Sequence, residues 1–146
     1  MHRRNMLLSA VTALGAAFAA ARANASFEKP QEGLKVVYHL SDLDKVAFVI
    51  GNIQNHLDGV SGNVTIALVV HGPALRAFHT AQANPDLTQR VGRLTQAGVG
   101  LTACGNTMKT QKVTLRDLLP GFVNDDRGGV VRIAELQSQG YLYLRP

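Results

Sequence analysis

The segment Val64–Val70 (VTIALVV) constrains the fold most, because it is apolar throughout apart from Thr65. A strand with one face in water alternates apolar and polar residues, whereas a strand covered on both faces is a continuous apolar run. Val64–Val70 therefore predicts a central strand of a parallel sheet that is buried on both faces.

Strand-like and helix-like segments alternate on both sides of this run. From Leu43 onward, for example, apolar residues recur at the spacing of one helical face. Alternating strands and helices favour a sheet between two helical layers. We predict one α/β domain with three α/β/α layers and a five-stranded, mostly parallel sheet. The expected strands are 34–40, 64–70, 99–103, 122–124 and 141–144, and the expected helices are about 43–57, 74–83, 85–97 and 129–139.

Short polar motifs mark where helices should start. Asn84 precedes a proline at a first helical position, and Thr114 followed by Asp117 resembles a capping box. Ser41 or Asp42 is positioned to cap the helix after the first strand by accepting a bond from an unpaired amide.

The N-terminus has the pattern of an export signal. Arg3 and Arg4 precede an apolar stretch to about Ala21, and Ala23–Ala25 gives a small-x-small cleavage site. The arginine pair indicates the twin-arginine route, with a plain secretory signal as the alternative. We expect a cleavable signal over 1–25, a flexible lead-in over 26–33, one domain over 34–146 and a periplasmic location.

Charge argues against a nucleic-acid partner. The signal holds three of the fifteen Lys and Arg residues and none of the ten acids, so the remaining chain carries +2 rather than +5. Its close basic pairs, such as Arg90/Arg93 and Lys109/Lys112, form no basic stripe. No later segment is long and apolar enough to span a bilayer, so no membrane association is expected after signal cleavage.

Cys104 is the only cysteine, so neither an intramolecular disulfide nor a C-x-x-C cycle is available. It follows the third predicted strand, where we expect a turn or a short helix to start. Its thiol is then either a small buried group or a reactive one. At a helix start the amides of Gly105–Thr107 stabilise a thiolate, and Lys109 adds positive charge.

The carboxyl ends of parallel strands meet at one edge of a sheet, where ligands bind. His39, His71 and Cys104 lie at the ends of the first three predicted strands. The histidines either cap loops or shape a pocket and move protons. A Cys/His/His metal site is a further alternative, although no close-spaced ligand pair supports it. The other candidate binding residues in these loops are Ser41, Gly72, Pro73, Gly105, Asn106 and Thr107.

Motifs for bound cofactors and for serine nucleophiles are absent. The chain has no G-x-G-x-x-G, no Walker loop and no G-x-S-x-G elbow, and we expect no cofactor. We interpret His56 and His79 as helix-surface residues, and Tyr141 and Tyr143 as packing or interface residues.

Five segments together resemble the DsrE/DsrF-like family: 35–40 (KVVYHL), 69–73 (VVHGP), 103–107 (ACGNT), 117–121 (DLLPG) and 136–146 (LQSQGYLYLRP). The resemblance spans about 34–146. It implies a three-layer α/β fold and oligomers built from dimers or trimers. It also implies a cysteine that carries persulfide sulfur between partner proteins, at the position of Cys104. Those relays are cytoplasmic hetero-oligomers, whereas this chain carries an export pattern.

The leading hypothesis is an exported sulfur carrier that holds sulfane sulfur as a persulfide on Cys104, a carrier more than an enzyme with turnover. Its partners would be sulfur donor and acceptor proteins or small sulfur species, and we expect a homo-oligomer (dimer, trimer or hexamer). The alternatives are a non-catalytic module that binds a small ligand or a protein, and a metal-binding protein using Cys104, His71 and His39.

Overall fold

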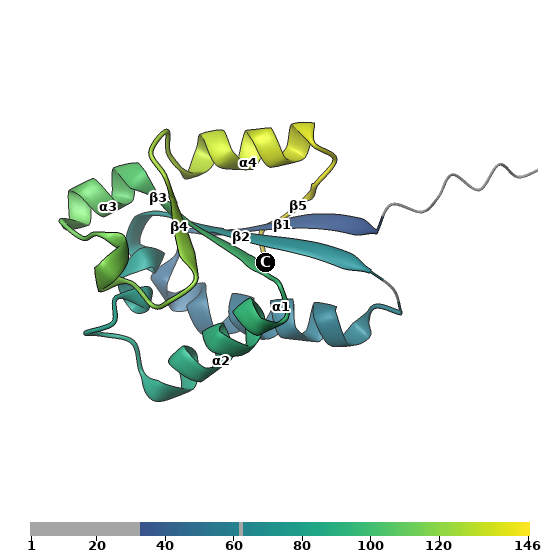
Figure 1. The fold of residues 1–146 in the computed structure, drawn as a ribbon, viewed down its shortest axis with the longest axis horizontal. Coiled ribbons are helices and arrows are strands. Elements are labelled where there is room, and N and C mark those ends of the chain that lie inside the picture. The colour runs from purple at the N-terminus through teal and green to yellow at the C-terminus, as the bar shows by residue number, and fades with distance from the viewer. Residues whose placement is uncertain (1–32, 62) are drawn as a thin grey trace, which may run out of the picture.

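A five-stranded sheet organises residues 33–61 and 63–146, the part of the chain that the computed structural model describes (Figure 1). The strand order is β4-β3-β2-β1-β5, and every neighbouring pair is parallel. The predicted fold class is confirmed, with a sheet that is parallel throughout rather than mostly. The strands are β1 Leu34–Leu40, β2 Val64–Val70, β3 Gly100–Cys104, β4 Phe122–Asp125 and β5 Leu142–Leu144.

Helices cover both faces of the sheet. Figure 1 shows α1 and α2 on one face, α4 on the other, and α3 beyond the carboxyl end of β3. The α-helices are α1 Val46–Gly59, α2 Pro85–Gln96, α3 Gly105–Gln111 and α4 Gly129–Ser138, and the 3₁₀ helices are η1 Leu43–Lys45, η2 Gly72–Phe78 and η3 Leu115–Asp117. The predicted signal over 1–25 and most of the lead-in over 26–33 lie outside the described residues.

Strand β2 separates two apolar cores, which explains its unbroken apolar sequence. Leu68 and Val70 belong to the larger core beneath α1 and α2. Val69 belongs to the smaller core beneath α4, with Ile133 and Leu136 of that helix. All three β2 side chains have no exposed surface. Because neighbouring side chains of a strand point to opposite faces, alternate residues of VTIALVV supply the two cores.

The helix starts follow the predicted signals in part. The Asn84 side chain accepts from the Leu87 amide at 2.8 Å, and Asp117 accepts from the Thr114 amide at 2.8 Å, as predicted. Asp42 makes no side-chain cap, and its carbonyl instead accepts from the Lys45 amide, which starts η1 ahead of α1.

The helix expected over 74–83 is wrong in type and extent. The segment is the 3₁₀ helix η2, which ends at Phe78. Gly72 starts it with φ of 60°, a conformation that side chains disfavour and glycine adopts freely. The expected placement of His79 on a helix surface is also wrong. His79 is buried after η2, and its Nε2 bonds the Gln111 side chain at 2.8 Å. Among the described residues, no helix is long and apolar enough to cross a membrane.

Candidate functional site

Three strand ends bring His39, His71 and Cys104 to one edge of the sheet. The first two are joined directly, because His39 Nε2 shares a hydrogen bond with His71 Nε2. His71 and Cys104 both flank Gly129, where an added Cβ would lie 3.4 Å from the Cβ of each. The predicted juxtaposition of these three residues is therefore what the structure has. His39 is the next-to-last residue of β1, as the expected strand 34–40 has it, and Cys104 is the last residue of β3, which runs one residue further than the expected strand 99–103.

The Cys104 thiol lies among hydrogen-bond donors. Burial raises its pKa, but the Thr107 hydroxyl and the backbone amides of Gly129, Thr107 and Asn106 outweigh that effect, so the pKa is lowered overall. Each donor favours the thiolate because it stabilises a negative charge at Sγ. The residue is only 6% exposed. The thiol is thus buried and also has a lowered pKa, as a reactive thiol has. The two alternatives that the sequence left open, a small buried group and a reactive one, therefore both apply to Cys104.

Thr107 connects the thiol to the loop after β2. Its Oγ1 accepts from the Gly72 amide at 2.9 Å while its hydroxyl donates to Cys104. Gln111, one helical turn later, donates from Nε2 to the Gly72 carbonyl at 2.9 Å. Both polar groups of the Gly72 backbone are therefore held by α3, which fixes the His71-Gly72-Pro73 turn beside the sulfur.

Two glycines permit close packing around the sulfur. A Cβ on Gly105 would lie 2.8 Å from the Asp125 carbonyl oxygen and from Asp126 Cα. Gly105 is one of the candidate binding residues of the sequence, but the end of β4 and the turn after it fill the space beside it. Gly128, with φ of 104°, lies close enough that a Cβ there would be 3.8 Å from Cys104 Sγ.

A second polar chain leads away from His71. His39 Nδ1 bonds the Tyr143 hydroxyl at 2.6 Å, and the rings of His39 and His71 stack at 4.7 Å between centroids. Burial, the neighbouring His71 and Arg145 lower the pKa of His39 to about 4, against the opposing Asp42. Burial and Arg145 also lower the pKa of His71. Both rings are neutral at pH 7, so each can accept or pass on a proton.

The remaining predicted residues lie further out. Ser41 accepts from Arg145 Nη2 at 2.9 Å, and its carbonyl accepts from the Ala74 amide, which ties the first loop to η2. Lys109 is exposed on α3. The groups that lower the pKa of Cys104 are hydrogen-bond donors, and Lys109 is not one of them.

Hollows flank α3 on two sides. Pro73, Arg76 and Thr107 line one of about 310 Å³, together with Gly72, Asn106, Thr110 and Gln111. Lys109 and Arg116 line another of about 450 Å³. Cys104 lines neither of these two hollows.

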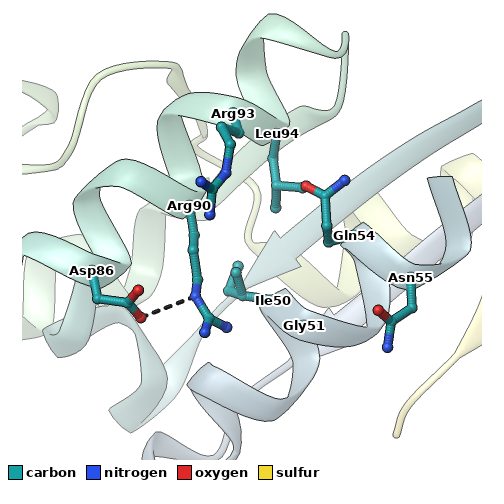
Figure 2. Close-up of a pocket in the computed structure, with 8 residues that line it drawn as sticks. All are labelled: Ile50, Gly51, Gln54, Asn55, Asp86, Arg90, Arg93 and Leu94. Carbon is teal, nitrogen blue, oxygen red and sulfur yellow. Dashed lines mark ion pairs between the residues drawn. The ribbon is translucent and has the colours of Figure 1, made fainter. Parts of the chain in front are cut away.

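A third hollow, of about 280 Å³, lies between α1 and α2, away from the predicted site (Figure 2). On the α2 side of this hollow, Arg90 Nε pairs with Asp86 Oδ2 at 2.9 Å. On the α1 side, Gln54 and Asn55 line it. Arg90 belongs to one of the basic pairs of the sequence. None of the residues predicted for the strand-end site lines this hollow.

The sequence did not reveal Gly128, Gly129 and Tyr143 as site residues. Two successive glycines, such as those before α4, indicate that the backbone there packs closely against another segment. Which segment that is depends on the order of the strands in the sheet. Tyr143 was expected in packing or an interface, whereas its hydroxyl bonds His39. His56, interpreted as a surface residue, bonds the Tyr38 hydroxyl at 2.9 Å.

A metal centre gains no geometric support. Within 33–61 and 63–146, no group of three or more His, Cys, Asp or Glu side chains is arranged to hold a metal ion. The two histidines meet through the hydrogen bond of their Nε2 atoms.

The fold and site define a class of α/β proteins with a hydrogen-bonded cysteine at the carboxyl edge of a parallel sheet. The chain belongs to the DsrE/DsrF-like family, whose model matches residues 10–146. None of the proteins with curated descriptions matches the chain significantly.

Solved structures share the fold. A protein of unknown function, MTH1491 from Methanobacterium thermoautotrophicum, superposes with a TM-score of 0.69 at 28% identity, over 77% of this chain and 99% of that one. The ychN protein from E. coli superposes with a TM-score of 0.56 at 14% identity, over 78% of this chain and 99% of its own, and supports the fold alone.

Proposed function

We propose that this protein is a sulfur carrier that holds sulfane sulfur as a persulfide on Cys104. The observation that carries the proposal is the set of donors around Sγ: the Thr107 hydroxyl and the amides of Asn106, Thr107 and Gly129. Four donors around a buried sulfur stabilise an anion there, and both a thiolate and a persulfide anion are such groups. Membership of the DsrE/DsrF-like family supports the same role.

The transfer itself needs neither an oxidant nor a reductant. The Cys104 thiolate attacks the outer sulfur of a donor persulfide, R–S–SH, and forms a new S–S bond. The S–S bond of the donor breaks, and R–S⁻ leaves with the bonding pair and takes up the persulfide proton. Cys104 then holds Cys–S–S⁻. An acceptor thiolate attacks the outer sulfur in the reverse sense and releases the Cys104 thiolate.

The paired histidines supply a route for that proton. His71 flanks the same glycine as Cys104, and its neutral ring bonds His39, which bonds Tyr143 at 2.6 Å. In this role His71 accepts a proton near the sulfur or returns one to it. As it does so, a second proton passes between His71, His39 and the Tyr143 hydroxyl on the exposed strand β5. Loss of this route should slow transfer while leaving sulfur binding intact.

The expected setting is the periplasm, reached by the signal over 1–25, with donor and acceptor proteins or small sulfur species as partners. A cysteine residue that is only 6% exposed restricts the donor to a slender group, such as the end of a polysulfide or an extended persulfide-bearing side chain.

Mass spectrometry of the intact protein tests the proposal. After incubation with polysulfide, or with thiosulfate and a donor enzyme, the protein should gain the mass of one or more sulfur atoms, and digestion should place them on Cys104. A reducing agent should remove them, and Cys104→Ser should gain none. An absence of adduct with every donor, together with a thiol inert to alkylation, would overturn the proposal.

A non-catalytic binding module is the second candidate. The hollow of about 310 Å³ beside α3 favours it, because Arg76 and several polar groups line a space of ligand size that excludes the thiol. In that case Cys104→Ser keeps ligand binding and biological activity, whereas the carrier loses function. Arg76→Ala would abolish binding under the second candidate only.

A further inference from the structure

The turn between β4 and α4 carries one of the donors to the sulfur. Asp125, the last residue of β4, pairs in register with Cys104, and the turn then returns so that Gly128 and Gly129 lie against that residue. A Cβ on Gly128 would be 3.8 Å from Sγ, a Cβ on Gly129 would be 3.4 Å from the Cys104 Cβ, and the Gly129 amide is among the groups that lower the pKa of the thiol. Unlike the amides of Asn106 and Thr107, this donor is not in the segment that follows Cys104 along the chain. Contacts between side chains and the turn must therefore hold the Gly129 amide next to Cys104.

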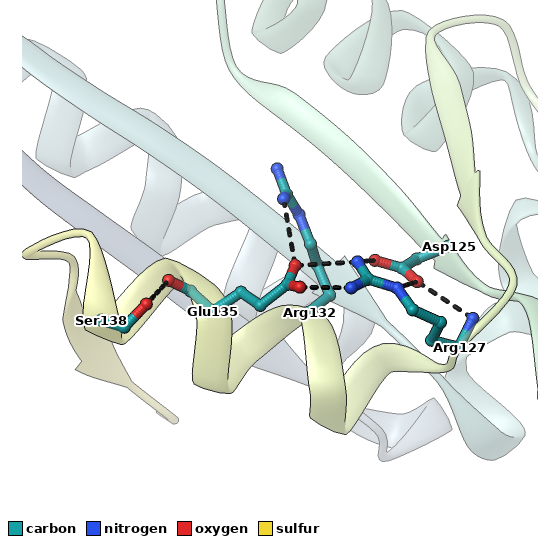
Figure 3. A network of polar contacts seen from close by, with 5 residues as sticks. All are labelled: Asp125, Arg127, Arg132, Glu135 and Ser138. Atoms are coloured by element: carbon teal, nitrogen blue, oxygen red, sulfur yellow. Dashed lines mark hydrogen bonds and ion pairs between the residues drawn. The ribbon is translucent and has the colours of Figure 1, made fainter.

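Arg127 fastens this turn at two points (Figure 3). Its backbone amide donates to Asp125 Oδ1 at 3.0 Å, and its Nη2 lies 3.1 Å from Asp125 Oδ2. Its two Nη groups also form a fork onto Glu135, with Nη2 at 2.8 Å from Oε2. The turn is thereby joined both to the strand end opposite Cys104 and to the body of α4.

The space around the turn leaves little room for other placements. At Gly128 an added Cβ would lie 2.7 Å from Asn106 Nδ2, and at Gly129 it would lie 3.2 Å from Val69 Cγ1. A shift of the turn toward the sheet is blocked by these contacts. A shift away from it is opposed by the Arg127 fork, since Glu135 is fixed on a helix whose Ile133 and Leu136 are buried.

We propose that Arg127 and Glu135 are positioning residues that hold the Gly129 amide against Cys104. The inference rests on the proposed role of Cys104 as a nucleophile. Surface ion pairs contribute little stability, typically about 0–1 kcal/mol. Arg127, whose side chain is 57% exposed, is therefore better explained by the geometry that its bidentate fork imposes than by stabilisation of the fold.

The test is the pH dependence of Cys104 alkylation by iodoacetamide. When the Gly129 donor drifts away, the thiolate loses one stabilising bond and the midpoint of the profile moves to higher pH. Arg127→Ala and Glu135→Ala should each lower the alkylation rate roughly threefold or more at a pH below the midpoint, since one pKa unit is a factor of ten in thiolate fraction. Arg132→Ala is the matched control, because the Arg132 side chain reaches Glu135 only at 3.8 Å, while its backbone amide, which bonds the Gly128 carbonyl at 3.1 Å, is kept in the variant.

Two variants separate positioning from plain electrostatics. Glu135→Ala removes a negative charge, which by itself would lower the midpoint, whereas a lost positioning contact raises it. Arg127→Lys keeps the charge but not the fork, and it serves if the alanine variants fold poorly by circular dichroism. A midpoint that falls in Glu135→Ala, or stays unchanged in Arg127→Lys, overturns the inference.

Alkylation needs no sulfur donor, so the two proposals fail separately. Shifted midpoints in a protein that takes up no sulfur would overturn the carrier function and leave the positioning role standing. Unshifted midpoints in a protein that loads sulfur normally would overturn the positioning role of Arg127 and Glu135 and leave the carrier function standing.

Discussion

The Nε2 atoms of His39 and His71 share a single hydrogen bond, although His39 lies near the end of β1 and His71 directly follows β2. Such a bond needs one nitrogen with a proton and one without. The pair is consequently compatible with two neutral rings but not with two doubly protonated ones. The lowered pKa values of both residues express this requirement together with their burial.

The histidine pair predicts a loss of stability in mild acid. The pKa of His39 is about 4 in the folded protein, below the usual 6.5, so the unfolded chain binds more protons between these values. Stability present above pH 6.5 should therefore be lost as the pH falls toward 4, by about 1 kcal/mol for His39 once solvent screening is allowed for. Asp42 and Arg145 also face the pair, and their opposing charges partly cancel.

Urea unfolding at several pH values measures this loss, and His39→Gln should flatten the curve between pH 6.5 and 4. The matched control is His56→Gln, which removes a histidine bonded elsewhere, to Tyr38, and should keep the acid loss. Asp117, Asp125 and Glu135 have lowered pKa values, so their contribution begins to be lost near their ordinary values of 3.8 to 4.5, at the acid end of this window, and this loss is common to the parent and both variants. An equal slope in His39→Gln and the parent protein would contradict the assignment.

Thr107→Val should impair both the thiol and the loop after β2. The valine keeps the shape of threonine but leaves Cys104 without its hydroxyl donor and the Gly72 amide without its acceptor. We expect the midpoint of the alkylation profile to rise, and the free energy of unfolding to fall by about 1–3 kcal/mol, the cost of an unpaired polar group. Thr107→Ser restores the hydroxyl and should recover both properties.

The sequence was sufficient for the layered fold and the strand edge of the site. Val64–Val70 must be covered on both faces, and parallel strands bring His39, His71 and Cys104 to one edge, so residue pattern alone led there. The Asn84 cap and the Thr114–Asp117 box are local interactions, which is why they were also predictable.

The parts that sequence reasoning missed depend on long-range packing. Tyr143 reaches His39 only because β5 adds next to β1, and nothing near either residue encodes that order. The Gly129 amide reaches Cys104 because β4 pairs with β3 and the chain then crosses to α4. His79 was misplaced for a related reason: its partner Gln111 lies on another element.

Two glycine substitutions of the same chemistry should have opposite effects. Gly92 lies inside α2 with open space where a Cβ would be, so Gly92→Ala should stabilise the protein by about 0.5–1 kcal/mol. A Cβ at Gly129 meets Val69, Cys104 and His71 at 3.2–3.4 Å, so Gly129→Ala should destabilise by about 1–3 kcal/mol through overpacking.

Thermal unfolding and alkylation together check this pair. Gly129→Ala should also change the alkylation profile of Cys104, because the added methyl group pushes on the residue itself, whereas Gly92→Ala should leave the profile as it is. Equal stability of the two variants would show that the site tolerates a wider gap between α4 and the sheet than the structure has.

Self-association is the last prediction, and it rests on the exposed apolar side chains of the edge strand β5. Leu142 is 57% and Leu144 is 38% exposed, and the two alternate with Tyr143 on a strand that, among residues 33–61 and 63–146, pairs only with β1. An open apolar edge favours pairing with another chain. We expect sedimentation equilibrium at micromolar concentration to give a dimer, trimer or hexamer, and Leu142→Lys with Leu144→Lys to shift it to smaller species. Gln96→Lys adds a like charge at an exposed polar position on α2 and should leave the assembly unchanged. A parent protein that sediments only as a monomer would rule out this role for β5.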